Sequence, residues 1–114
     1  MSMQKAYLGR LTIPISQDKS NVLVAEEGKM ARGLLFSNVE TAFTGTIAVL
    51  VGHDEAVLIA NMLPAYVDGT QVTVSANRVQ QWTISGVVAV ALDSSGTEAA
   101  ARNVDVWLLL ELPD

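Results

Sequence analysis

The length, composition and charge of this chain exclude several classes of protein. It has 114 residues, the size of one domain, and no cysteine, so it can form no disulfide, thiolate metal site or cysteine nucleophile. Its net charge is −5 and its seven basic residues are scattered along the chain, which argues against binding to nucleic acid, because phosphates attract clustered basic residues.

Hydrophobic residues are unusually frequent for a chain this short. They make up 50% of the sequence, against 17% charged residues, and the mean hydropathy is +0.34. No run approaches the roughly 18 apolar residues of a membrane helix, and residues 1–10 lack the apolar stretch of an export signal. We therefore expect synthesis in the cytoplasm, no membrane partner, and an apolar surface that another protein chain covers.

Residues 1–10 are polar and weakly patterned up to Tyr7, and they carry Lys5 and Arg10, two of the seven basic residues. We predict that they form an N-terminal arm, ordered mainly by contact with a neighbouring chain. Tyr7 and Leu8 would fill a groove on that neighbour, while the two cations meet an acidic surface. The remaining residues, 11–114, would form a single β-sandwich domain.

Beyond the arm, short blocks rich in Val, Ile, Leu and Thr alternate with turn residues, which is typical of a sandwich or barrel. We expect strands at residues 8–15, 21–25, 31–38, 46–51, 56–62, 71–76, 79–85, 87–92 and 104–112. The clearest predicted hairpin joins residues 47–51 to 56–59, and only residues 97–102 have helical character. The fold predicted from this pattern is all-β: an antiparallel β-sandwich of jelly-roll type.

Two segments have an apolar residue at every second position, which predicts one buried and one solvated face. In residues 71–76 the expected inner residues are Val72, Val74 and Ala76. In residues 80–85 they are Trp82 and Ile84.

Residues 86–92 and 104–112 differ from these segments, because both of their faces are apolar. A chain of this length has difficulty burying two such strands on both faces. We therefore expect a homo-oligomer, most plausibly a trimer, with Trp107, Leu109 and part of residues 87–92 at subunit contacts. With Tyr7 and Leu8 of the arm, Trp107 and Leu109 are the predicted interface residues.

No set of residues predicts catalysis. His53 is the only histidine, and a metal-dependent cupin needs several imidazoles around one ion. No serine lies in a Gly-x-Ser-x-Gly sequence, and the adjacent acidic pairs Glu26–Glu27 and Asp54–Glu55 point apart in extended chain. The sequence also lacks an Asp-x-Asp-x-Asp calcium loop and a glycine-rich phosphate loop. We expect no catalytic residue, no metal and no cofactor, and therefore no enzyme.

The order of segments between residues 31 and 92 is familiar. The segments are ARGLLF (31–36), GTIAV (45–49), NMLP (61–64), QVTVSANRV (71–79) and VAVAL (88–92). This order resembles the small jelly-roll or β-sandwich proteins of tailed-phage virions, namely head decoration (cement) proteins and the bases of head spikes. The chain departs from spike bases at residues 82–86, which read WTISG in place of a Thr-Thr-Ala step, and in its apolar segment 104–112. The resemblance implies a symmetric oligomer, such as a trimer, seated on a capsid lattice.

Three classes of function follow from the composition and the resemblance. The first is a structural virion protein that binds the major capsid protein, or another virion protein, and stabilises the capsid lattice. The second is a receptor- or carbohydrate-binding module of a phage particle, which the small number of aromatic residues disfavours. The third, an enzyme of cupin-like fold, is disfavoured by the single histidine.

Overall fold

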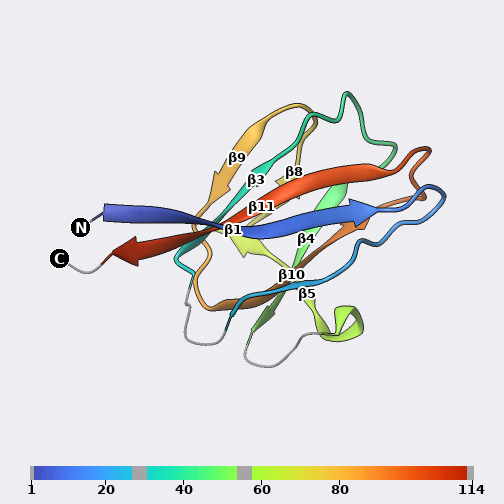
Figure 1. Cartoon of the computed structure of the whole chain (residues 1–114). Helices are drawn as coiled ribbons and strands as arrows, with labels where there is room; N and C mark the ends of the chain where they lie inside the picture. The colour runs from blue at the N-terminus through green and yellow to red at the C-terminus, as the bar shows by residue number, and fades with distance from the viewer. Residues whose placement is uncertain (1, 27–30, 54–57, 113–114) are drawn as a thin grey trace.

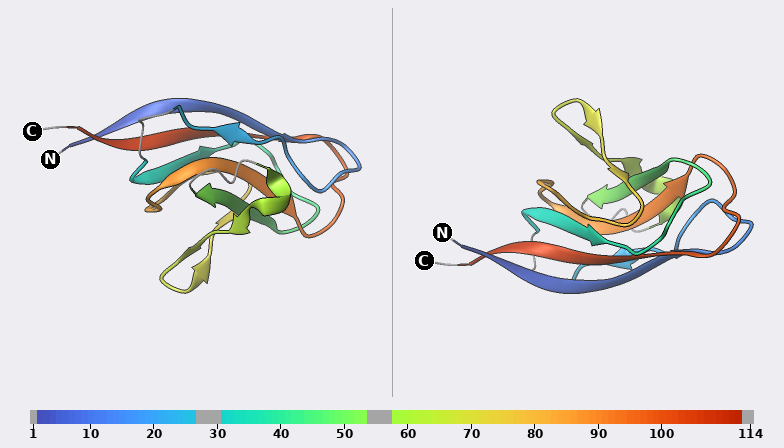
Figure 2. Two further views of the ribbon diagram at one scale, coloured as in Figure 1. Left: turned by 90° about the horizontal axis from the view of Figure 1, so that it is seen from below. Right: turned by 90° about the horizontal axis from the view of Figure 1, so that it is seen from above.

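The computed structural model describes residues 2–26, 31–53 and 58–112, which form two packed antiparallel sheets (Figures 1 and 2). The first sheet has the order β1-β11-β3-β9, with β1 Ser2–Ile13, β3 Gly33–Ser37, β9 Val79–Trp82 and β11 Arg102–Leu112. The second has the order β2-β10-β4-β5, and β8 also pairs with β4. Its bounds are β2 Leu23–Val24, β4 Ile47–His53, β5 Leu63–Pro64, β8 Thr73–Val74 and β10 Val87–Ser94.

The remaining elements are a 3₁₀ turn, η1 (Ile59–Asn61), and a small hairpin of β6 (Tyr66–Val67) and β7 (Thr70–Gln71). In this hairpin Asp68 and Gly69 both have positive φ, as the tight turn of a two-residue hairpin loop requires. The hairpin projects away from the two sheets in Figure 2. Within the described residues, no helix has the length and hydropathy needed to cross a membrane.

The chain alternates between the two sheets, which is the connectivity of a jelly roll. It passes from β1 to β2 in the other sheet, back to β3, across to β4 and β5, back to β9, across to β10, and back to β11. The last strand thereby lies between the first and the third. The prediction of an all-β antiparallel sandwich of jelly-roll type is confirmed.

The core lies between the sheets and consists of the inward-facing residues of the long strands. Every second residue of β11 faces it, at Val104, Val106 and Leu108, as alternation along a strand requires. Val72 and Val74 are buried in the core as predicted, and Trp82 and Ile84 pack against it. The largest fully buried apolar side chains are Leu11, Ile13, Leu34, Phe36, Ile47, Val49, Val72, Val90, Leu92, Val104 and Val106.

The outer face of β10 is covered by the chain itself at Ala89 and Ala91, so this part of residues 87–92 is not free for the predicted subunit contact. Ala89 and Ala91 on β10 and Leu50 on β4 form a second buried cluster with Met62, against which Ile59 and Val22 also pack. The small alanine side chains let the segment around η1 lie close over the sheet. Residues 58–62 therefore cover the sheet and are not the predicted strand. The second half of the predicted hairpin turn and the start of its second strand, residues 54–57, lie outside the described residues.

The described part of the predicted arm belongs to the sandwich, so this prediction is also corrected. β1 pairs with β11 along its whole length, from Ser2 opposite Leu112 to Ile13 opposite Arg102. A bulge between Tyr7 and Gly9 shifts the register. β3 reaches β11 only as far as Leu109, so the ends of β1 and β11 continue beyond the other strands toward the left of Figure 1. Residues 97–101 form no helix.

Candidate interaction surface

The outer face of the first sheet carries a row of side chains that crosses four strands. Tyr7 on β1 lies opposite Trp107 on β11, Trp107 lies opposite Leu35 on β3, and Leu35 lies opposite Gln81 on β9. We call Tyr7, Trp107, Leu35 and Gln81 the aromatic row. Because directly opposite residues of paired strands point to the same face, the row forms one continuous strip across the sheet.

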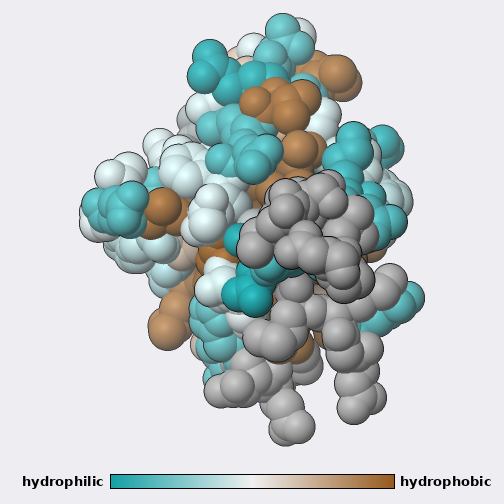
Figure 3. Space-filling view, turned by 90° about the vertical axis from the view of Figure 1, so that its left-hand side faces the viewer, coloured by the Kyte–Doolittle hydropathy of each residue, from teal (hydrophilic) through white to brown (hydrophobic). Residues whose placement is uncertain are grey.

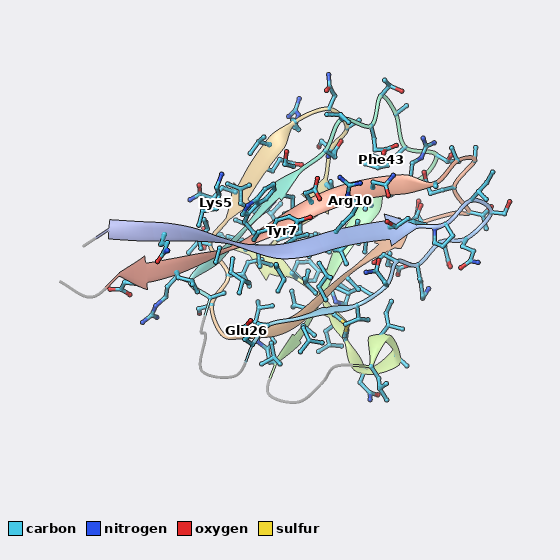
Figure 4. All side chains as sticks on the ribbon, viewed as in Figure 1. Lys5, Tyr7, Arg10, Glu26 and Phe43 are labelled. Carbon is cyan, nitrogen blue, oxygen red and sulfur yellow. The ribbon has the colours of Figure 1, made fainter. Side chains whose placement is uncertain are left out.

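The two rings of the aromatic row contact each other. The centroids of Tyr7 and Trp107 are 5.1 Å apart, with an angle of 60° between the ring planes, an edge-to-face arrangement. Nζ of Lys5 lies 5.1 Å from the centroid of Trp107, within the range of a cation–π interaction. Tyr7 is 57% exposed, whereas Trp107 is half-buried beneath its neighbours. Figure 4 shows Lys5, Tyr7 and Arg10 spaced along β1.

Asp105 lies on β11 beside the aromatic row, opposite Arg10, and anchors Tyr7. Its Oδ1 accepts hydrogen bonds from the Tyr7 hydroxyl at 2.7 Å and from Arg10 Nε at 3.1 Å, and its Oδ2 accepts one from a terminal guanidinium nitrogen of Arg10 at 3.2 Å. The Arg10 hydrogen bonds lower the pKa of Asp105, against the effect of burial. The hydrogen bond to Asp105 raises the pKa of Tyr7, so the phenol stays protonated. The site therefore holds a fixed ion pair beside a protonated phenol.

A slot opens beside β1 on the side that faces β2. It has a volume of about 140 Å³ and is lined by Ala6, Tyr7, Leu8, Val24, Glu26 and Leu108. Figure 4 shows Glu26 on this side of β1. A dry cavity of about 150 Å³ admits a molecule the size of benzene, so the slot has room for one apolar side chain.

The structure does not bring the four predicted interface residues together on one exposed surface. Tyr7 and Trp107 are brought into contact on the outer face. Leu8 points inward and packs against the core, and Leu109 is only 7% exposed. Tyr7 and Leu8 therefore do not lie together on one surface. Asp105 was not predicted from the sequence as the partner of Tyr7. Asp105 and Trp107 are two residues apart on β11 and therefore point to the same face, which is the signal that could have identified it.

Glu98 is the centre of a buried polar cluster at the other end of the sandwich. It is 1% exposed and accepts hydrogen bonds from the Ser94 hydroxyl at 2.6 Å and from the N–H groups of Thr44 at 2.8 Å and Gly45 at 2.9 Å. Arg102 Nε donates a further bond at 2.9 Å. Each oxygen of the Glu98 carboxylate accepts two hydrogen bonds, so neither is free to accept one from a substrate. The cluster joins the loop that precedes β4 to the loop that precedes β11.

His53 lies at the exposed end of β4, where Nδ1 is 3.0 Å from the carbonyl oxygen of Gly86. Its neighbours Asp54 and Glu55, which the sequence analysis placed in a turn, lie outside the described residues. Within residues 2–26, 31–53 and 58–112, no three His, Asp or Glu side chains converge in a way that could hold a metal ion.

Comparison with known proteins adds little to this description. No protein-family model matches the sequence, and no curated protein is significantly similar to it. Among solved structures, the crystal structure of the Yersinia pseudotuberculosis-derived mitogen is similar over 99% of this chain and 88% of the mitogen, with 12% sequence identity and a TM-score of 0.44. A likeness at this level bears on neither the function nor the partners of the chain.

Proposed function

We propose that this chain is a structural virion protein, a decoration or cement protein that binds a capsid lattice and stabilises it. The observation that carries the proposal is the aromatic row: an exposed Tyr7 and a half-buried Trp107, held by Asp105 and Lys5 on a rigid sheet. Tyrosine and tryptophan in such settings are the residues that most often dominate the binding energy of protein interfaces. The resemblance of the sequence to small virion proteins supplies the kind of partner, the major capsid protein or another virion protein.

The left-hand side of the molecule in Figure 1 supports contact with a partly polar surface. In the part of this side that Figure 3 draws in colour, hydrophobic groups lie between hydrophilic ones. Such mixed surfaces are typical of partners that associate after each has folded. Burial of the row would contribute roughly 25 cal/mol per Å² of apolar area, before the costs of association are subtracted. Repetition over a lattice would multiply this modest contribution.

Self-association is part of the proposal. A homotrimer that closes around the first sheet would cover Tyr7 and Trp107 in every subunit, since cyclic symmetry lets one surface be buried repeatedly. Light scattering of the purified protein measures the oligomeric state directly. If the protein is a monomer at all concentrations, the trimer is excluded, but binding to the lattice is not.

The deciding experiment compares the heat resistance of phage particles with and without the protein. We expect particles that carry it to release their DNA at a higher temperature. The double variant Tyr7→Ala/Trp107→Ala should no longer bind or protect them. Tyr66→Ala is the matched control, because Tyr66 is equally exposed, at 60%, but lies on the β6–β7 hairpin. Equal heat resistance with and without the protein would overturn the proposal.

The alternative is a receptor- or carbohydrate-binding module, favoured by one observation: an aromatic pair directly beside a carboxylate, at Tyr7, Trp107 and Asp105. Sugars stack on open aromatic faces, and Lys5 lies over the ring of Trp107, so the lysine would have to move aside. Loss of host attachment by particles that lack the protein, with unchanged heat resistance, would favour this alternative.

A further inference from the structure

β1 is an edge strand of the first sheet, and in the described part of the chain only half of its free edge is closed. In an antiparallel pair, residues alternate between those whose N–H and C=O bond to the partner strand and those whose groups point away. Asn21 shows which residues point away: its Oδ1 accepts from the N–H of Thr12 at 2.8 Å, and its Nδ2 donates to the carbonyl of Arg10 at 3.1 Å. This side-chain clamp closes the edge after the bulge.

Before the bulge, the same alternation turns the N–H and C=O of Lys5 and Tyr7 to the free edge. Their partners on β11, Leu109 and Trp107, face β3, as the 2.8 Å hydrogen bond from the N–H of Arg32 to the carbonyl of Leu109 confirms. Within the described ranges 2–26, 31–53 and 58–112, no strand pairs with this side of β1. An unpaired strand edge is a ready template for a strand of another chain.

The slot lies beside this open half. Ala6, between Lys5 and Tyr7, points inward and lines it together with Leu8 and Leu108. A residue of an added strand directly opposite Ala6 would point to the same side, toward the slot. The residue opposite Lys5 would lie on the outer face, next to the ammonium group that already covers Trp107.

We infer that the open half of β1 binds an extended segment of a partner protein as an added antiparallel strand. The segment has the pattern x-apolar-acidic: x lies opposite Tyr7, the apolar side chain enters the slot opposite Ala6, and the acidic side chain pairs with Lys5. This inference rests on the proposed function and deepens it, because it states how the lattice protein is held.

Charge selects another protein over a second copy of β1. The charged residues of β1 are Lys5 and Arg10, both positive, and Arg10 is already paired with Asp105. A second β1 would therefore offer no acid to Lys5.

The test uses the intact protein and fluorescein-labelled peptides, with fluorescence anisotropy as the readout. The probe is Thr-Thr-Val-Glu-Thr-Thr with blocked ends. Replacing its Glu with Lys should weaken binding about two- to fivefold, the effect of one cross-strand charge pair. Replacing its Val with Ala should weaken binding about tenfold, because two methyl-sized groups leave the slot.

Three variants of the protein probe the same contact from the other side. Lys5→Pro removes an outward N–H without breaking the β1–β11 ladder and should abolish binding. Ala6→Leu fills the slot from within and should weaken binding about tenfold, even if Lys5→Pro fails to fold. Lys5→Glu should reverse the preference for the acidic peptide. Arg78→Glu makes the same charge change at an exposed residue before β9 and should have no effect.

Hydrogen exchange separates strand addition from other modes of binding. On binding the peptide, the amides of Lys5 and Tyr7 should exchange more slowly, while that of Ala6, which already faces β11, stays unchanged. Equal binding of all peptides, or no added protection at Lys5 and Tyr7, would overturn the inference even if particles are stabilised. Peptide binding without particle stabilisation would overturn the proposed function but would not contradict strand addition at the β1 edge. A dimer that Lys5→Pro dissociates would replace the partner segment with a second copy.

Discussion

Arg102 at the start of β11 and Glu98, four residues before it, form an ion pair: Arg102 Nε donates a 2.9 Å hydrogen bond to the Glu98 carboxylate, whose side chain is fully buried. Arg102 also lies 3.6 Å from Glu40, whose other oxygen accepts from the N–H of Asn103 at 3.0 Å. The start of β11 is thus fastened to the loop that precedes β4. A charge in this position stabilises the fold only while all its partners stay in place.

Replacement of Glu98 tests how much this buried polar cluster stabilises the fold. Glu98→Gln keeps the shape but leaves Arg102 without its closest anion and puts an amide N–H₂ among the N–H groups of Thr44 and Gly45. We expect the free energy of unfolding in urea to fall by about 3 kcal/mol. The control is Glu111→Gln, which removes a surface ion pair with Arg32 and should cost less than about 1 kcal/mol. Equal losses of unfolding free energy in the two variants would show that the buried cluster stabilises the fold no more than a surface ion pair does.

Stability should also fall in acid because of Glu98. Burial alone would raise the pKa of its carboxyl, but hydrogen bonds from Ser94, from the N–H groups of Thr44 and Gly45, and from Arg102 lower it from 4.5 to about 2. A folded-state pKa below the unfolded value favours folding above pH 4.5, and the contribution disappears as the pH falls toward 2. Urea unfolding measured across this window should show a decline of a few kcal/mol that Glu98→Gln reduces. A parallel decline in both proteins would assign the acid sensitivity to other carboxylates.

Gly45 lies where the backbone must approach the Ser94–Gly96 turn closely. A Cβ at this position would be 2.5 Å from Ser94 Oγ, 2.8 Å from Ser95 Oγ and 2.9 Å from the Gly96 nitrogen. Gly45→Ala should therefore destabilise the protein by about 1–3 kcal/mol, as overpacking of tight sites does. Gly96→Ala is the matched control, because a Cβ there meets nothing within 4 Å. Thermal unfolding of both variants measures the difference, and a neutral Gly45→Ala would mean that the turn relaxes.

Met62 should contribute to stability although it lies on the outside of a sheet. It is 6% exposed and covers Leu50, Ala89 and Ala91. Met62→Ala would uncover them and should cost about 2–4 kcal/mol. Leu63→Ala, at a neighbouring residue that is 68% exposed, should change the free energy of unfolding by less than about 0.5 kcal/mol. A small effect of Met62→Ala would point to a partner chain as the real cover of this face.

Trp107 should be required for self-association. Trp107→Asp places a second carboxylate beside Asp105 on the outer face and removes the ring that Tyr7 and Lys5 contact. Light scattering should show that the variant dissociates or aggregates, while Tyr66→Asp on the β6–β7 hairpin leaves the association state unchanged. An unaltered oligomer in both variants would place the subunit contact elsewhere.

The sequence pattern predicts which strands are covered but not what covers them. Residues 87–92 are apolar on both faces, and both faces are buried, yet the second cover is Met62 and the segment around η1. An apolar residue has the same signature whether its neighbour belongs to its own chain or to another. The tertiary path of residues 58–62 decides between them, and their local pattern suits a strand as well as a covering loop.

The bulge in β1 explains why the sequence pattern predicts an arm there. Gln4, Ala6 and Leu8 share one side before the bulge, whereas Leu11 and Ile13 face the core after it. The inward set changes from even to odd residue numbers, so no single period of two spans β1. The Tyr7–Asp105 contact was equally hidden, because it joins residues 98 positions apart in the sequence.

The position of β11 between β1 and β3 has a consequence for how the chain folds. The strands that β11 joins are made first, but neither can pair with it until residues 102–112 have left the ribosome. The first sheet therefore forms late, after a loop of nearly the whole chain has closed, and folding dominated by such distant pairings is slow, on the order of milliseconds to seconds. During that interval the free edges of β1 and β3 are exposed together, and aggregation competes with completion of the sandwich.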